Sequence, residues 1–310
     1  MTILVTGAAG TIGVNLVKAL LKREKKVIGL DNFITGSHHN LEKLKSSPNF
    51  TFIEMALEDP RVKEKLKDIE IDQIFHLACP TGVPNLEKLS EEMLSASSKG
   101  TKHILQIALQ KKARFIYSSS SEVYGDPLVS PQTEDYTGNV NPIGLRSPYE
   151  EGKRFSEALT EAFVKKYNLD AKIVRIFNTF GPDYFESDLR VIPHFLTQAF
   201  HSQDLIVQGD GTQRRTFLYV DDLIQGLFLV IEQGLKGEVY NLGSDIEISI
   251  LKVAELILKM TKSKSKIVFS KRPDHDPEMR KPALDKIKKL GWQQTLSLEE
   301  GLKKILSNLQ

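Results

Sequence analysis

Short runs of apolar, largely β-branched residues recur along the first 177 residues and predict the strands of a sheet. The runs are four to six residues long and end in small or polar residues, as buried strands of a parallel sheet do. They lie at residues 3–6, 27–30, 50–53, 73–77, 113–118 and 172–177. Between them, longer amphipathic segments at residues 11–22, 86–112 and 148–167 predict helices.

The alternation of strands and helices favours a parallel, doubly wound sheet with helices on both faces, so the expected fold class is α/β of the Rossmann type. Beyond residue 178 the pattern loosens, with turn signals at residues 181–182 (Gly-Pro) and 209–211 (Gly-Asp-Gly). We expect a dinucleotide-binding Rossmann domain of residues 1–177 together with 216–243. A smaller C-terminal substrate-binding domain, residues 178–215 and 244–310, should close over the carboxyl edge of the sheet.

The composition narrows the class of protein. With 310 residues, 40% of them hydrophobic, the chain can bury one or two large cores. Its formal charge of +2 gives no reason to expect nucleic acid or an anionic membrane as a partner. The one cysteine, Cys79, follows an apolar run and is expected to be a buried side chain in a reducing compartment. With no secretory pattern or bilayer-length apolar stretch, we expect a soluble, cytoplasmic protein, and we predict no metal site.

Three glycines at the first strand–helix junction predict a dinucleotide site. Gly7, Gly10 and Gly13 follow a strand and open a helix, the context that makes their spacing informative. They allow a tight turn, close approach of the backbone to a pyrophosphate, and close helix–strand packing. Asp31 ends the next strand, where an acid accepts hydrogen bonds from the adenosine ribose and repels a 2′-phosphate, so NAD is preferred over NADP. Alternatively, the glycines are plain turn residues and Asp31 is a strand-end acid.

Tyr149 and Lys153 are four positions apart and share one face of the third predicted helix. A neighbouring ammonium favours the phenolate and lowers the tyrosine pKa from its ordinary value near ~10. Such a tyrosine takes or returns a hydroxyl proton while a hydride leaves the same carbon for a nicotinamide. Alone, the pair could be two ordinary helix residues. The upstream serine run at residues 118–121, Glu122 and the glycine motif favour a redox active site.

These features resemble the extended short-chain dehydrogenase/reductase family. The likeness covers nearly the whole chain, and its most specific parts are the serine–glutamate and tyrosine–lysine segments. It is closer to the UDP-glucuronate decarboxylases (UDP-xylose synthases) than to the dTDP-glucose dehydratases or the UDP-galactose epimerases. The segments that carry it are residues 31–36, 76–80, 119–127, 141–142, 146–154, 175–182, 209–217, 241–243 and 276–282.

The resemblance implies how NAD and the sugar's C4 hydroxyl are handled. Tyr149 is the acid/base for that hydroxyl, Ser120 hydrogen-bonds it, and Lys153 lowers the tyrosine pKa and binds the nicotinamide ribose. The implied cofactor contacts are Gly7, Gly10, Thr11, Ile12, Gly13, Asp31, Asn32, Thr35, Gly36, Leu77, Ala78, Tyr149 and Lys153.

The resemblance also implies a substrate and a reaction. Ser121 and Glu122 lie near C5 and the sugar carboxylate, with Arg280 as a further catalytic charge. Oxidation of UDP-glucuronate at C4 gives a ketone β to the carboxylate, carbon dioxide leaves through an enolate, and re-reduction gives UDP-xylose with no net change in NAD. The implied substrate contacts are Asn178, Arg190, Arg215 and Arg280.

Simpler interpretations remain open. The serine run could be a strand-to-loop transition whose hydroxyls bond the backbone, and Glu122 could be a solvated loop carboxylate. Arg280 could be exposed, and Arg215, beside Arg214, could form a surface ion pair. For the whole protein, the alternatives are a C4 oxidase, epimerase or 4,6-dehydratase acting on another nucleotide sugar, and a non-enzymatic NAD-binding protein. The two long predicted helices resemble the helix-bundle interface of relatives, so we expect a homodimer.

Five positions depart from the family pattern. Ala56 stands in place of an aspartate that contacts adenine, and Ser97 in place of an asparagine. Asp183 replaces an arginine, Leu86 a tyrosine, and Gln208 an aromatic residue in the nucleobase region. The last three bear on the substrate, since a charge reversal at Asp183 disfavours a nearby anion. The redox chemistry is therefore better supported than the identity of the sugar or the nucleobase.

Overall fold

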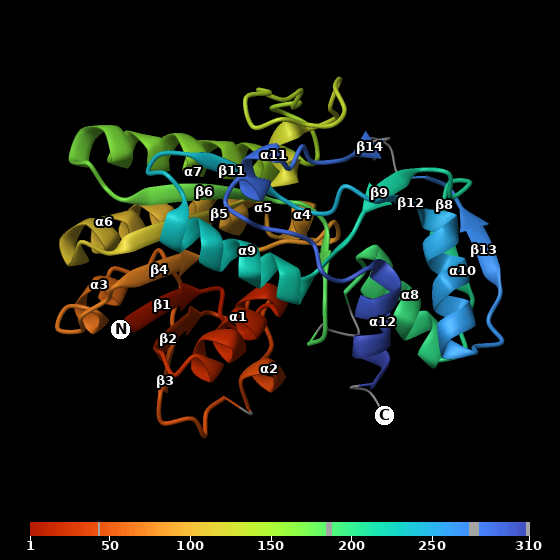
Figure 1. Cartoon of the computed structure of the whole chain (residues 1–310), viewed down its shortest axis with the longest axis horizontal. Helices are drawn as coiled ribbons and strands as arrows, with labels where there is room; N and C mark the ends of the chain where they lie inside the picture. The colour runs from red at the N-terminus through yellow and green to blue at the C-terminus, as the bar shows by residue number, and fades with distance from the viewer. Residues whose placement is uncertain (43, 184–187, 273–278, 308–310) are drawn as a thin grey trace.

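The computed structural model describes residues 1–42, 44–183, 188–272 and 279–307, and its centre is a parallel sheet of seven strands (Figure 1). The strands lie in the order β11-β6-β5-β4-β1-β2-β3, and all adjacent pairs run parallel. Their bounds are β1 Thr2–Thr6, β2 Lys26–Asp31, β3 Phe50–Glu54, β4 Gln73–His76, β5 Arg114–Ser120, β6 Ala171–Ile176 and β11 Val239–Leu242. The α/β prediction is confirmed, and so are the six predicted strands, with ends shifted by at most two residues.

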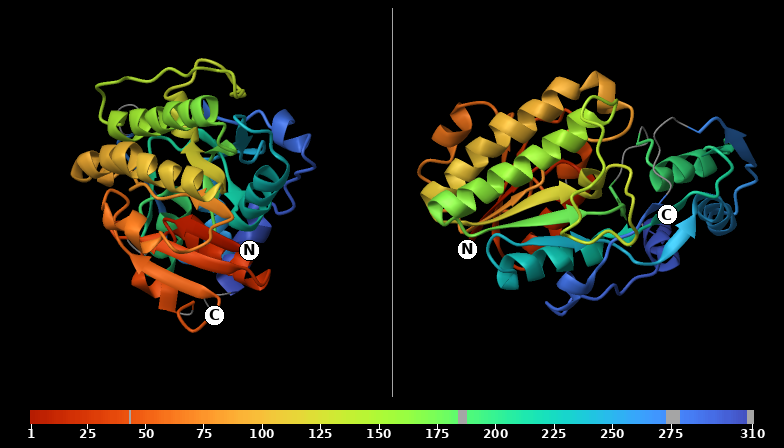
Figure 2. Two further views of the ribbon diagram at one scale, coloured as in Figure 1. Left: turned by 90° about the vertical axis from the view of Figure 1, so that its left-hand side faces the viewer. Right: turned by 90° about the horizontal axis from the view of Figure 1, so that it is seen from above.

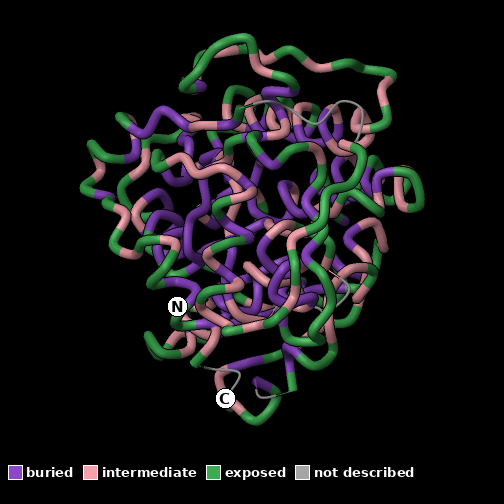
Figure 3. Tube along the Cα trace, turned by 90° about the vertical axis from the view of Figure 1, so that its right-hand side faces the viewer, coloured by how far each residue is buried: buried purple, intermediate pink, exposed green. Residues whose placement is uncertain are grey.

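Helices cover both faces of this sheet (Figure 2). α1 (Thr11–Lys22) packs beside α9 (Val220–Gln233) on one face, and α6 (Thr101–Lys111) beside α7 (Ser147–Tyr167) on the other. Successive strand residues point to opposite faces, so Ile3 and Val5 of β1 join the core under α1 and α9, whereas Leu4 joins the core under α6 and α7. Both faces are buried, as the centre of Figure 3 shows, which explains the unbroken apolar runs in the sequence.

The predicted helix over residues 86–112 is wrong as a single element. The chain forms α4 (Asn85–Lys88), breaks at Leu89, and continues as α5 (Ser90–Ser95), a π-helical turn (Ala96–Gly100) and α6. Hydroxyl groups bond carbonyls of the wider turn: Thr101 Oγ1 donates to Ala96 O at 3.1 Å, and Ser156 Oγ of α7 donates to Ser97 O at 2.5 Å. Apolar spacing alone does not reveal such a turn, because the periodicity hardly changes across it.

The remaining elements form a smaller lobe beside the end of the sheet at which the strands finish, on the right of Figure 1. It contains a three-stranded sheet, β12-β9-β14, and a two-stranded sheet, β13-β8, with α8 packed against α10. The bounds here are β7 Thr179–Phe180, α8 Val191–Phe200, β8 Leu205–Gln208, β9 Arg214–Thr216, β10 Leu218–Tyr219, β12 Glu247–Ser249, α10 Ile250–Thr261, β13 Ile267–Ser270, β14 Met279–Arg280 and α12 Leu298–Ser307. α11 (Asp285–Lys288) lies against β11 of the central sheet (Figure 1).

Three short helical segments complete the part of the molecule built around the central sheet. They are α2 (His38–Glu42), α3 (Arg61–Lys65) and the 3₁₀ turn η2 (Ser121–Tyr124). The chain leaves the sheet after β6 and returns to it through α9 and β11, so the two parts of the molecule are interleaved in sequence. Among the described residues, no helix combines the length and the apolar character needed to cross a bilayer. Residues 276–278 of the last family-like segment lie outside the described residues.

Candidate active site

The turn between β1 and α1 is built around glycines at two of the three predicted positions. Gly7 has φ +71°, a left-handed conformation that favours glycine, and a Cβ on it would come within 2.9 Å of Ala78 N. A Cβ on Gly13 would lie 1.9 Å from Gly7 O. A Cβ on Gly10, by contrast, would meet only Gly7 O at 3.5 Å, an ordinary contact. Packing within the chain therefore requires the first and third glycines and leaves the second free for a ligand's close approach.

A cavity of about 760 Å³ opens at this turn, within the usual size range of ligand sites. It contains every cofactor contact predicted from the glycine and aspartate segments, together with residues from the start of the smaller lobe. Its lining includes Gly7, Gly10, Thr11, Ile12, Gly13, Asp31, Asn32, Thr35, Gly36, Ala56, Leu77, Ala78, Cys79, Thr81, Ser118, Asp188, Leu189 and Arg190. The residues present thus fit a dinucleotide along the carboxyl ends of β1, β2 and β4.

Asp31 is held rigidly at the end of β2. Its carboxylate accepts hydrogen bonds from Ala9 N at 2.9 Å and from Phe33 N at 2.8 Å. Burial raises the pKa of Asp31, and these two backbone amides oppose that rise. In this orientation the Asp31 carboxylate is suited to accept hydrogen bonds from ribose hydroxyls. Ala56, which lines the same cavity, offers only a methyl group where relatives carry an aspartate.

Tyr149 and Lys153 lie in the first two turns of α7 and, unlike the other predicted cofactor contacts, are not among the residues that line the cavity. Lys153 is buried, and its Nζ donates to Ser118 O at 2.7 Å and lies 5.7 Å from the centroid of the Tyr149 ring. Burial raises the pKa of Tyr149 well above its usual value; hydrogen bonds with the side chains of Ser120 and Thr81 act in the opposite direction. The predicted lowering of the tyrosine pKa by Lys153 is therefore wrong for the chain alone, because desolvation of the phenolate dominates.

The serine run lies where β5 ends against α7. Ser120 Oγ accepts a hydrogen bond from Glu122 N at 3.2 Å and so caps η2, which is the backbone-bonding role of the simpler interpretation. The same hydroxyl is also a hydrogen-bond partner of the Tyr149 phenol. Ser121 is buried, and Ser119 Oγ donates to Glu157 Oε1 at 2.5 Å. Ser118, Ser119 and Ser121 are buried and Ser120 is partly buried, so the run combines the backbone-bonding role with a position next to Tyr149.

Glu122 is enclosed by two arginines. Arg280 Nη1 and Nη2 both donate to its carboxylate, as does Arg146 Nη2. The side chains of Glu122 and Arg280 are only 17% and 5% exposed, so the solvated carboxylate and the exposed arginine considered as alternatives are both wrong. Burial opposes ionisation of Glu122, but Arg280 and Arg146 outweigh it and lower the pKa of Glu122 to about 2. Arg146 was missed by sequence reasoning, although it stands three residues before Tyr149.

The other predicted substrate residues occupy three places. Arg190 lines the dinucleotide cavity, and its Nε donates to the Asp188 carboxylate at 2.9 Å. Arg215 of β9 pairs in register with Arg280 of β14, which sets the two residues side by side on the small sheet. Asn178 follows β6 and accepts a hydrogen bond from Leu218 N through its carbonyl at 2.9 Å. Arg214, next to Arg215, forms an ion pair in this region, with its Nε 3.6 Å from Glu247.

The charge reversal at Asp183 is balanced within the chain. Its carboxylate lies 2.6 Å from Lys18 Nζ of α1, and its carbonyl accepts a hydrogen bond from Thr11 Oγ1 at 3.3 Å. The expectation that Asp183 repels an anionic substrate group is therefore corrected, since a lysine neutralises it. Leu86 is buried in α4, and Gln208 is exposed on β8.

Cys79 differs from expectation, and Ser97 is its neighbour. Cys79 is only partly buried and lines the cavity, where a thiol was expected to be fully buried. Its sulfur lies 3.6 Å from Ser97 Oγ. Ser97 is buried in the π-helical turn beside α7, so the position of the usual family asparagine is filled by a short hydroxyl group.

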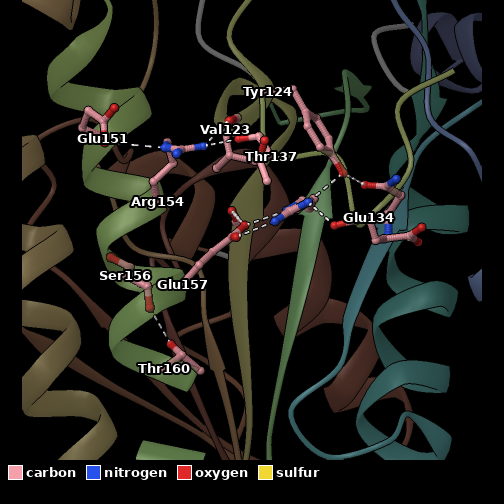
Figure 4. Close-up of polar contacts among 12 residues, drawn as sticks. Val123, Tyr124, Glu134, Thr137, Glu151, Arg154, Ser156, Glu157 and Thr160 are labelled. Atoms are coloured by element: carbon pink, nitrogen blue, oxygen red, sulfur yellow. Dashed lines mark hydrogen bonds and ion pairs between the residues drawn. The ribbon is translucent and has the colours of Figure 1, made fainter. Parts of the chain in front are cut away.

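A buried polar network supports the strand ends behind the serine run. Glu157, shown in Figure 4, lies one helical turn beyond Lys153 and receives Arg175 Nε at 2.9 Å and Nη2 at 2.8 Å. Arg175 Nη1 also donates to the Tyr124 hydroxyl at 2.9 Å, and that hydroxyl donates to Asn241 Oδ1 at 2.7 Å. The network joins α7, β6, η2 and β11, so the elements that carry the serine run and the phenol are held in one frame.

Comparisons with known proteins agree with this geometry. A profile of the NAD dependent epimerase/dehydratase family matches residues 3–243. UDP-glucuronic acid decarboxylase 6 of Arabidopsis thaliana is 41% identical over 304 residues, which cover 97% of this chain and 87% of the relative. The structure of a UDP-glucose 4-epimerase with UDP-glucose from Thermotoga maritima has a TM-score of 0.91 at 27% identity, covering 100% and 99% of the two chains. A UDP-glucuronic acid 4-epimerase from Bacillus cereus, in complex with UDP-glucuronic acid and NAD, gives 0.88 at 30% identity and covers both chains completely.

Proposed function

The chain belongs to the NAD dependent epimerase/dehydratase family, and from this premise we propose that it is a UDP-glucuronate decarboxylase that makes UDP-xylose. The observation that carries the proposal is the buried Arg280 beside Glu122, close to Ser120 and Tyr149. A guanidinium in that position suits recognition of a carboxylate on the sugar. Relatives about 40% identical over nearly the whole chain are named UDP-glucuronic acid decarboxylases, which supports the same substrate.

NAD is the cofactor, and when bound it accepts a hydride from C4 of the sugar and later returns it. The amides that follow Gly7 at the start of α1 would hold the pyrophosphate. Asp31 would accept the adenosine ribose hydroxyls, and Lys153 would bind the nicotinamide ribose. We assign this cofactor site to the part of the chain comprising residues 1–177 and 216–243, and the nucleotide-sugar site to residues 178–215 and 244–310.

Tyr149 serves as the base that removes the C4 hydroxyl proton. Ser120 positions the hydroxyl and shares a hydrogen bond with the phenol. Burial raises the net pKa of Tyr149. Against that rise we propose the Lys153 ammonium, 5.7 Å from the centroid of the Tyr149 ring, as the positive charge that favours the phenolate. The phenol then returns its proton to the C4 oxygen at the end of the cycle.

Decarboxylation follows from the position of the ketone. Once C4 is a carbonyl, the bond between C5 and the carboxyl carbon breaks and its electron pair forms an enolate. Hydrogen bonds from Tyr149 and Ser120 stabilise the negative charge on the C4 oxygen. Protonation at C5 gives the 4-keto pentose, and return of the hydride to C4 with the phenol proton on the C4 oxygen gives UDP-xylose. Arg280 holds the departing carboxylate at one end of this arrangement, with Glu122 and Ser121 beside it and Asn178, Arg190 and Arg215 as proposed contacts to the rest of the nucleotide sugar.

We also propose a cytoplasmic homodimer. Phe155 of α7 is 52% exposed, and Leu94 of α5, which packs against α7, is 45% exposed. A second copy that covers this face would bury both side chains. Sedimentation of Phe155→Glu tests the proposal, with a monomer expected for the variant and a dimer for the native chain.

The function is tested by adding UDP-glucuronate, labelled with ¹³C at C6, to purified protein saturated with NAD. Labelled carbon dioxide and a UDP-pentose, formed without added reductant, are the expected products. A product of unchanged mass but altered C4 configuration would instead identify an epimerase, the activity named for the Bacillus cereus structure. UDP-glucose serves as the control substrate because it differs from UDP-glucuronate only at C6, where it carries a primary alcohol in place of the carboxylate.

A further inference from the structure

Four charged side chains meet beside Tyr149. Glu122 lies between Arg280 and Arg146, and Arg146 Nε also donates to Glu150 Oε1 at 3.1 Å. Their exposed fractions are 17% for Glu122, 5% for Arg280, 22% for Arg146 and 6% for Glu150. Two carboxylates and two guanidiniums make the group neutral and largely shielded from water. A further negative charge that enters this group must therefore change which arginine pairs with which carboxylate.

The two arginines differ in what they can still bind. Arg280 comes from β14 in the smaller lobe, and its buried Nε has no hydrogen-bond partner among the described residues. Arg146 directly precedes α7 and bridges Glu122 to Glu150, which lies one turn further along. Arg280 thus has donor capacity for another acceptor, whereas Arg146 is committed to two carboxylates.

A second carboxylate next to Glu122 makes Arg146 necessary. The charges that act on Glu150 are Glu122, Arg146 and Arg280, and its pKa is raised by burial and by the charge of Glu122. Without Arg146 the two acids would repel each other in a poorly hydrated place. Arg146 therefore fixes both the charge and the direction of Glu122.

We propose that Arg146 and Glu150 form a brace that keeps Glu122 in place while Arg280 turns from Glu122 to the carboxylate of the substrate. This inference rests on the proposed function, since UDP-glucuronate supplies the extra negative charge. When the bond between C5 and the carboxyl carbon breaks, that charge passes to the C4 oxygen and carbon dioxide leaves neutral. Arg280 is then free to return to Glu122. Arg146 touches neither substrate nor cofactor and acts as a positioning residue.

The test compares binding with chemistry in NAD-loaded protein. Calorimetry gives the affinity for UDP-glucuronate relative to UDP-glucose, and rapid quenching gives the single-turnover rate of carbon dioxide release. Arg280→Gln should lose the preference for UDP-glucuronate. Arg146→Gln should keep that preference within threefold but release carbon dioxide at least tenfold more slowly. The acidic limb of the pH–rate profile of Arg146→Gln should move to higher pH, because Glu122 loses one of the two cations that hold its pKa down.

Arg154→Gln is the matched control. Arg154 lies on the same helix and bonds the carbonyls of Val123 and Thr137, as Figure 4 shows, without touching Glu122. The single-turnover rate of carbon dioxide release by Arg154→Gln should stay within twofold of the native rate, with an unchanged pH profile. Arg146→Lys keeps the charge but cannot bridge two carboxylates in fixed geometry, so it should fall between native and Arg146→Gln. If Arg146→Gln does not fold, the rate and the pH profile of Arg146→Lys test the brace instead.

Two outcomes would overturn the brace. Loss of the UDP-glucuronate preference in Arg146→Gln or Arg146→Lys would make Arg146 a direct substrate contact. An unchanged rate and pH profile in both variants would make it merely structural. Failure of the proposed function has a different signature, because the native protein would then bind UDP-glucuronate and release no carbon dioxide.

Discussion

Lys18 Nζ lies 2.6 Å from the carboxylate of Asp183, joining the helix that follows the glycine turn to the segment that opens the smaller lobe. Thr11, at the start of the same helix, donates to the carbonyl of Asp183. Arg190, a few residues further on, lines the cavity. The pair therefore helps to set the distance between the two walls of the dinucleotide site.

Reversing one charge of this pair should weaken NAD binding. Asp183→Arg places two cations together and should cost about 1 kcal/mol of stability, near the upper end for a partly exposed pair. The double variant Lys18→Glu, Asp183→Arg should recover most of the loss. Thermal unfolding and NAD titration check both variants. Equal affinities in native protein and Asp183→Arg would show that the pair has no part in holding the site together.

The second and third glycines should respond differently to alanine. Gly13→Ala drives a methyl group into Gly7 O and should destabilise the fold by about 3 kcal/mol, at the high end for overpacking. Gly10→Ala makes only an ordinary contact within the chain, so the fold should persist while NAD affinity drops at least tenfold. Urea unfolding and NAD titration separate the two effects. A Gly10→Ala protein with native affinity would mean that no ligand approaches this backbone closely.

Tyr149→Phe should abolish turnover and leave NAD binding intact. Loss of a positioned acid/base costs roughly 10²–10⁴-fold in rate, while the phenyl ring preserves packing on α7. Tyr167→Phe, at the exposed end of the same helix, is the control and should be fully active. The measurement is the rate of carbon dioxide release at saturating UDP-glucuronate. A phenylalanine variant that turns over at the native rate would exclude Tyr149 as the acid/base.

Glu122 should make stability depend on pH in acid. Its folded pKa, about 2, is below the ordinary 4.5, so its contribution is complete above pH 4.5 and disappears as the pH falls toward 2. The shift corresponds to about 3 kcal/mol. Urea unfolding of native protein and Glu122→Gln between pH 6 and ~3 should therefore converge as the pH falls. Parallel curves would show that Glu122 is not held ionised by its arginines.

The sequence predicted the sheet well because both faces of each strand are buried, so apolar runs such as residues 27–30 stand out from their surroundings. The part of the cavity lining at the glycine turn was also predictable, since local glycine geometry determines it. Arg146 and the pairing of Glu122 with Arg280 were harder to foresee. They depend on contacts between residues far apart in the chain, which no local spacing records.

Charge balance was the other limit on prediction. Asp183 looked unfavourable for an anion because Lys18 is distant in sequence, and only the fold brings the two together. The Tyr149 pKa was misjudged for a related reason. Spacing on a helix shows that Lys153 is near, but it does not show how much water the phenol loses when the helix packs against β5.

Arg280 reaches Glu122 from 158 residues further along the chain. A ribosome must therefore add 158 residues after Glu122 before the glutamate gains this partner. Truncated products that end before β14 would retain the glycine turn and Asp31 but lack the guanidinium.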